Sequence, residues 1–106
     1  MNNLNSILIE GSVSEEAKFL KHKDFYLCQF AITSRRFDDS GKTLSCVHIA
    51  IEAHGNLAVI CKDKAKIDTP IRIVGRLEND NSAKIYVLAE HIEFRMEYFG
   101  ENDDES

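Results

Sequence analysis

Long apolar runs are absent from this chain. No segment approaches the roughly 18 consecutive apolar residues that a membrane-spanning helix needs. The amino end also lacks the basic segment and long apolar stretch that mark a secretory signal. These absences argue against a membrane protein and predict a cytoplasmic one. The 106 residues, 43% of them hydrophobic, suffice for one domain with a modest core.

Cysteine is scarce, and its spacing fits no metal or redox motif. Cys28, Cys46 and Cys61 are odd in number and scattered, without the two-residue spacing of a zinc or disulfide-exchange pair. We expect all three to be reduced, buried thiols. The histidines have no Cys or His partner at ligand spacing. Neither a metal nor another cofactor is therefore predicted.

Catalytic signatures are missing as well. There is no P-loop, no His-Glu-x-x-His, no nucleophile elbow and no pair of carboxylates in an apolar setting. The pair Asp38-Asp39 belongs to a segment rich in turn formers, where solvated carboxylates are the default. The sequence therefore predicts a binding protein and not an enzyme.

An excess of positive charge is also lacking, although many nucleic-acid binders have one. The formal net charge is -5, but residues 1–95 carry all 13 Lys and Arg and 13 of the 18 Asp and Glu. We expect a neutral folded domain over residues 1–96 and a disordered acidic tail over residues 97–106. A neutral domain binds phosphates only where its cations gather on one face, so its affinity should be modest.

The chain does contain alternating apolar and polar residues, the pattern of β-strands. The expected strands include Ile7 and Ile9, Tyr26–Phe37, Leu44–His54, Ile71–Leu77 and Ile85–Ala89. In the second strand, Cys28, Phe30 and Ile32 share the apolar face. In the third strand the inward residues are Val47, Ile49, Ile51 and Ala53, and the outward residues are Cys46, His48, Ala50, Glu52 and His54. Five strands are predicted.

One short helix is predicted between the third and fourth strands. Within Gly55–Lys66, Leu57, Ile60 and Cys61 recur at helical spacing, and Asn56 is placed to cap the amino end.

Turn-forming residues separate the remaining strands. They fill Asp38–Lys42 and Asn79–Ser82, which we expect to join neighbouring strands. Pro70 suits the first residue of the strand that follows the helix. The predicted order is three strands, a helix and two strands.

Four segments of the chain carry a resemblance to a known family. They are Leu4–Gly11 (LNSILIEG), His48–Ala58 (HIAIEAHGNLA), Ile71–Leu77 (IRIVGRL) and Ile85–Arg95 (IYVLAEHIEFR). In order and spacing they resemble the DNA-binding domain of bacterial single-stranded DNA-binding proteins. The resemblance implies an all-β fold with one short helix, the five-stranded OB-fold barrel. It also implies sequence-nonspecific binding of single-stranded DNA in replication, repair or recombination.

Binding of unpaired strands needs flat rings for bases and cations for phosphates. Phe37 matches a position where the family usually has a stacking aromatic residue, although it could also shield a loop. His48 and His54 fall where the family commonly has tryptophan or phenylalanine. An imidazole can stack on a base, but both histidines could equally be ordinary exposed side chains.

The expected phosphate contacts are cations on three predicted strands. They are Arg35, Arg36, Arg72, Arg76 and Lys84. Arg72 and Arg76 share the outer face of the fourth strand, and we expect Lys84 to begin the fifth. Each could instead be a solvated surface charge.

Two departures from the family pattern open other hypotheses. The segment Glu78–Lys84 is too short for the family's long hairpin, and the acidic tail lacks a terminal Pro-Phe. An alternative is an OB-fold accessory protein of the replication or primosome machinery, similar to primosomal replication protein N, which acts through protein contacts. A third is a paralogue that joins the oligomers of a full-length single-strand binder. The family resemblance also implies a homodimer or homotetramer, with Asn2–Ile7 adding to a partner's sheet.

Overall fold

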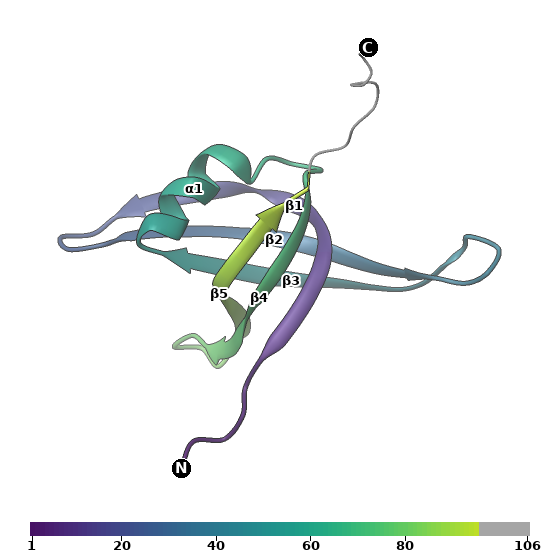
Figure 1. Ribbon diagram of the computed structural model, residues 1–106, viewed down its shortest axis with the longest axis horizontal. Coiled ribbons are helices and arrows are strands. Elements are labelled where there is room, and N and C mark those ends of the chain that lie inside the picture. Colours follow the sequence, from purple (N-terminus) through teal and green to yellow (C-terminus); the bar gives the residue numbers. More distant parts are fainter. Residues whose placement is uncertain (96–106) are drawn as a thin grey trace.

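The computed structural model describes residues 1–95 and shows a closed five-stranded barrel with one helix (Figure 1). The elements are β1 (Ile7–Lys21), β2 (Tyr26–Phe37), β3 (Thr43–His54), α1 (Asn56–Lys64), β4 (Pro70–Asn79) and β5 (Ile85–Phe94). The strands close in the order β1-β2-β3-β5-β4. The predicted OB-fold barrel is therefore confirmed, and the predicted acidic tail over residues 97–106 lies outside the described residues.

Strand β1 is longer than predicted because it serves two neighbours in turn. Its first part, Ile7–Ser12, pairs with β4, and Ser12–Lys21 pairs with β2. The switch needs Gly11, since a Cβ there would lie 2.3 Å from the backbone oxygen of Thr33. Two register shifts follow along the second part of β1. They break the alternation that would have revealed the strand in the sequence.

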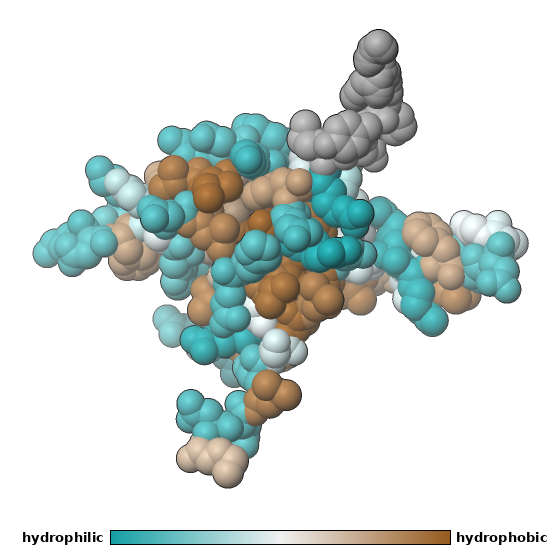
Figure 2. Space-filling view, viewed as in Figure 1, coloured by the Kyte–Doolittle hydropathy of each residue, from teal (hydrophilic) through white to brown (hydrophobic). Residues whose placement is uncertain are grey.

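The core lies inside the barrel and under α1. Its largest fully buried side chains include Ile32, Ile51, Ile71, Ile73, Val13 and Val87. Helix α1 adds Ala58 and Cys61 to the same cluster, and Ala65, directly after the helix, joins them. The small side chains of these residues let the helix approach the barrel closely. Figure 2 shows hydrophobic residues over the helix and the adjoining barrel wall.

Two details of the predicted helix are wrong. Gly55, with φ 65°, occupies the N-cap position, and no side chain caps the helix, so Asn56 is its first residue. Ile60 is 44% exposed. The buried stripe runs through Ala58 and Cys61 instead, because the helix turns its small residues toward the barrel.

The β2–β3 hairpin extends beyond the barrel wall (Figure 1). Strand β3 pairs with β5 only at Ile51 and Glu52, whereas its pairing with β2 continues to the hairpin end. Val47 was predicted to face the core but is 49% exposed, because no third element covers this extension. The predicted turn follows Phe37, where Asp38 Oδ1 accepts hydrogen bonds from the backbone N–H groups of Ser40 and Lys42.

Across residues 1–95, no helix has the length and apolar character required to cross a membrane.

Candidate nucleic-acid interface

The outward sides of β2 and β3 form one continuous surface, which we call the β2–β3 face. Cross-strand partners share a face in an antiparallel sheet. The partners on this surface are Arg35 and Cys46, Thr33 and His48, Ala31 and Ala50, Gln29 and Glu52, and Leu27 and His54. The face therefore runs from the hairpin extension to the end of β3 beside α1.

The hairpin end of this face carries a ring and a cation. Phe37 is 56% exposed at the last residue of β2, and Arg35 lies two residues before it, on the other side of a register shift between Arg36 and Phe37. Arg36 pairs with Ser45 and points to the opposite side. The structure thus places Arg35 and Phe37 at the same hairpin end of β2, with Arg36 on the opposite side from Arg35.

His48 lies in the middle of the hairpin part of the face, with both ring nitrogens engaged. Its Nδ1 lies 2.9 Å from Thr33 Oγ1, and its Nε2 lies 3.6 Å from Cys46 Sγ. Thr33 is only 4% exposed, so its hydroxyl is held in place by the packing around it. The contact with this buried hydroxyl therefore fixes the orientation of the His48 ring. Cys46 itself is exposed, which corrects the expectation that all three thiols are buried.

His54 lies at the other end of the face and contacts an acid and an aromatic ring. Its Nε2 is 2.7 Å from Glu52 Oε2, and its ring centroid is 5.8 Å from that of Phe25. His48 and His54 are six residues apart on one strand, roughly 20 Å at the usual rise per residue. They share a face, as predicted, but they do not form one contact site.

The two arginines of β4 are already paired with carboxylates. Arg72 Nη2 lies 2.7 Å from Glu10 Oε2, and Arg76 Nε lies 3.0 Å from Glu78 Oε2. The hydrogen bond and charge of Arg72 hold the pKa of Glu10 below its usual value. Arg72 nevertheless lines one shallow hollow with Arg35.

Lys84 was predicted to begin β5, but it belongs to the loop before that strand, which starts at Ile85. Its backbone N–H donates to Asp80 Oδ1 at 2.9 Å, which closes the turn. Arg76 and Lys84 do not line the hollow that Arg35 shares with Arg72.

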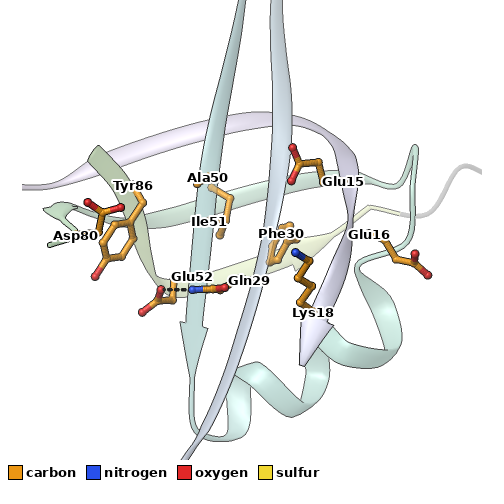
Figure 3. A pocket seen from close by; sticks show the side chains of 10 residues that line it. All are labelled: Glu15, Glu16, Lys18, Gln29, Phe30, Ala50, Ile51, Glu52, Asp80 and Tyr86. Carbon is orange, nitrogen blue, oxygen red and sulfur yellow. Dashed lines mark hydrogen bonds between the residues drawn. The ribbon is translucent and has the colours of Figure 1, made fainter. Parts of the chain in front are cut away.

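An acidic groove of about 250 Å³ opens at the middle of the β2–β3 face, whose Gln29, Ala50 and Glu52 belong to its lining (Figure 3). It is lined by Glu15, Glu16, Lys18, Gln29, Phe30, Ala50, Ile51, Glu52, Asp80 and Tyr86. Gln29 Nε2 donates to Glu52 Oε1 at 3.1 Å. Burial, and then the carboxylates of Glu52, Glu78 and Asp80, raise the pKa of Tyr86. This groove repels phosphate groups, and it was not predicted because its acids come from distant parts of the chain.

The turn between β1 and β2 gathers aromatic and basic side chains that the sequence analysis missed. We call Lys21, His22, Lys23, Phe25 and Tyr26 the hairpin cluster. The rings of His22 and Phe25 stack with centroids 5.1 Å apart, and Lys21 Nζ lies 5.9 Å from the centre of the Tyr26 ring. Because Phe25 also contacts His54, the cluster continues the β2–β3 face. The available signal was the short run from Lys21 to Tyr26, in which the basic Lys21, His22 and Lys23 are closely followed by the aromatic Phe25 and Tyr26.

Among residues 1–95 no group of three or more His, Cys, Asp or Glu side chains is arranged to hold a metal ion.

Comparison with solved structures identifies proteins of the same fold. The small single-stranded DNA-binding protein from Streptomyces coelicolor superposes with a TM-score of 0.79 at 17% identity, over 91% of this chain and 96% of that one. The second single-stranded DNA-binding protein of Mycobacterium smegmatis gives 0.74 at 17% identity, over 85% and 87%. A deletion mutant of the Thermus aquaticus single-stranded DNA-binding protein gives 0.72 at 18% identity, over 88% and 51%.

No family model matches the sequence, and no curated protein matches it either. At these identities the structural likeness establishes the barrel and its topology.

Proposed function

We propose that this chain binds single-stranded DNA without sequence preference through the β2–β3 face. The observation that carries the proposal is an exposed Phe37 two residues after Arg35, at the hairpin end of β2 in an OB-fold barrel. A ring for base stacking next to a cation for phosphate is the combination that such binding requires. The superposed structures, which are named as single-stranded DNA-binding proteins, support this assignment.

The bound strand would follow the β2–β3 face from one end to the other. It would contact Phe37 and Arg35 first, then pass His48 and Ala50, at the edge of the acidic groove. Beyond them it would reach His54 and the hairpin cluster, whose lysines supply cations and whose rings supply stacking surface. Strand faces and the β1–β2 loop are common ligand sites of OB-folds.

The affinity should be modest for three structural reasons. Arg72 and Arg76 are paired with Glu10 and Glu78, the acidic groove borders the path, and residues 1–95 have balanced charge. Fluorescence anisotropy with labelled oligo(dT), titrated with salt, tests the proposal. We expect a clear negative slope of log K against log salt, with RNA and duplex DNA as competitors that define the preference. Absence of binding even in dilute buffer would overturn it.

The biological role follows from this activity. A protein that coats unpaired strands serves DNA replication, repair or recombination in the cytoplasm, and it needs no catalytic step. The competing role is that of an accessory protein that acts through protein contacts. The acidic groove with Tyr86 favours it, since carboxylates there suit a basic protein surface better than DNA. Little affinity for oligo(dT) at any salt would favour this second role.

Self-association is proposed through the first part of β1. Within the described residues, Ile7–Glu10 pair only with β4, so their other edge is open for a second copy, which would form a homodimer or homotetramer. Leu8 is 66% exposed there. Light scattering of Leu8→Glu should show a smaller assembly than the parent. Ile85→Glu, at a site 57% exposed on β5, is the matched control and should leave the mass unchanged.

A further inference from the structure

Three side chains from two strands form a connected chain that ends in a thiol on the β2–β3 face. Thr33 Oγ1 lies 2.9 Å from His48 Nδ1, and His48 Nε2 lies 3.6 Å from Cys46 Sγ. Cys46 and His48 are two residues apart on β3 and therefore share a face, while Thr33 is the cross-strand partner of His48. The sheet register thus produces the arrangement.

The order of the three groups is that of an activated nucleophile. A nucleophilic thiol contacts a base, and the base is oriented by a third group. When His48 carries its hydrogen on Nδ1 and donates it to Thr33 Oγ1, its Nε2 is free to accept the proton of Cys46. Thr33 is 4% exposed and so keeps the ring in that orientation. Arg35 is the cross-strand partner of Cys46 and so lies on the same face of the hairpin.

The other two thiols provide a contrast within the same molecule. Cys28 and Cys61 are buried in the core. Burial raises the pKa of Cys28, and burial together with Cys28 raises the pKa of Cys61 to about 12. Both therefore stay protonated and inaccessible. Reaction with a soluble reagent is confined to Cys46.

We infer that Cys46 is a modification site for small disulfides of the oxidised glutathione class, and that its modification blocks the β2–β3 face. The second part rests on the proposed function. Cys46 gives its proton to His48 Nε2, and the thiolate attacks one sulfur of the disulfide. The reagent's S–S bond breaks as the mixed disulfide forms, and the other half leaves as a thiolate that takes the proton. The Cys46 sulfur is oxidised and the departing sulfur is reduced.

The position of the adduct explains its effect on binding. A glutathionyl group on Cys46 would stand between Arg35 and His48, on the proposed path of the strand. It would bring a net negative charge close to the cation that meets phosphate. A thiol reductant would remove it, so the block is reversible.

The first experiment measures the site and rate of the exchange. Folded protein is incubated with oxidised glutathione, and the adduct is located by mass spectrometry. We expect one adduct, at Cys46, and none in Cys46→Ser. His48→Gln should slow the reaction at least about fivefold, and Thr33→Val should slow it less. His54→Gln is the matched control, since it removes an imidazole from the same strand and face but far from Cys46.

The second experiment measures oligo(dT) affinity before and after modification. We expect the adduct to bind about tenfold more weakly than reduced protein, and dithiothreitol to restore binding. Oxidised glutathione should not change the affinity of Cys46→Ser.

Several outcomes would overturn the inference. They are adducts on Cys28 or Cys61 in the folded protein, a parent-like rate in His48→Gln, or undiminished binding by the adduct. If the reduced protein does not bind oligo(dT), the proposed function is wrong, and so is the inference that modification of Cys46 blocks binding. The exchange rates alone then decide whether Cys46 is a modification site.

Discussion

Glu10 and Arg72 face each other across the β1–β4 ladder, with Glu10 Oε2 2.7 Å from Arg72 Nη2 and 3.0 Å from Arg95 Nη1. One carboxylate therefore occupies two guanidinium groups. Arg72 lines the same hollow as Arg35. Because Arg72 is paired with Glu10, it is less available to a phosphate of the bound strand, although the sequence analysis predicted that contact.

Replacing this carboxylate should strengthen DNA binding. In Glu10→Gln, Arg72 loses its nearest anionic partner and keeps only the longer contact with Glu93 at 3.6 Å, so it becomes more available to a phosphate. We expect oligo(dT) affinity to rise about threefold and the salt slope to become more negative by about 0.7, the value for one phosphate contact on a single strand. Salt-titrated anisotropy measures both. Glu90→Gln makes the same change in net charge at another exposed site, and an equal gain there would show that only net charge matters.

Removing the Phe37 ring should weaken binding. Stacking of a base on an aromatic side chain contributes about 1–3 kcal/mol, so Phe37→Ala should lower oligo(dT) affinity by about tenfold. Leu44→Ala is the control, because Leu44 is 54% exposed near the same hairpin end, whereas Phe37 is 56% exposed. Equal losses in the two variants would mean that Phe37 contributes only general apolar surface.

A side chain at Gly11 should destabilise the barrel. The added Cβ of Gly11→Ala would lie 2.3 Å from the Thr33 carbonyl oxygen, and two paired backbones would have to separate. We expect a loss of about 2 kcal/mol in the free energy of unfolding, measured by urea denaturation. Gly41→Asn should be nearly neutral. No atom lies within 4 Å of its Cβ, and asparagine tolerates the φ of +88° better than most residues.

The β2–β3 turn should lose order only in strong acid. The Ser40 hydroxyl and then the Lys42 N–H donate to the Asp38 carboxylate and hold its pKa below the usual 3.8. A depressed pKa stabilises the fold fully above the unfolded value, and this contribution is lost as pH falls through the folded value. The amide resonances of Ser40 and Lys42 should therefore shift together below pH 3.8.

Asp38→Asn supplies the control for this titration. The same two amide resonances should show no coupled transition in this variant, because no carboxylate titrates there. A transition that persists in Asp38→Asn would assign it to another group.

Local patterns in the sequence were sufficient for most of the strands, whereas their closure into a barrel was implied by the family resemblance. Alternation located the strands around Ile32, Ile51 and Ile73, which are fully buried or nearly so. The turn at Asp38 could be predicted because its side chain bonds backbone groups only a few residues away. The second part of β1 was missed because its register shifts disturb the alternation.

Less of the candidate site could be predicted from the sequence. Strand parity placed His48 and His54 on one face, and the structure agrees. The number and spacing of the cysteines, by contrast, predicted a buried Cys46, whereas strand parity had placed it on the outward face and the hairpin extension leaves it exposed beside His48. The pairing of Arg72 with Glu10, 62 residues away in the chain, could not be foreseen.

The sequence by itself determined which residues alternate, where the chain turns and which strand face each side chain takes, because these depend on neighbours along the chain. Only the tertiary structure decided which cations are paired, which thiol is exposed and where carboxylates from separate strands converge. These properties depend on barrel closure, which brings Glu10 against Arg72 and groups Glu15, Glu52 and Asp80 around one groove. Contacts between distant segments carry no periodic signal, so no pattern in the chain reveals them.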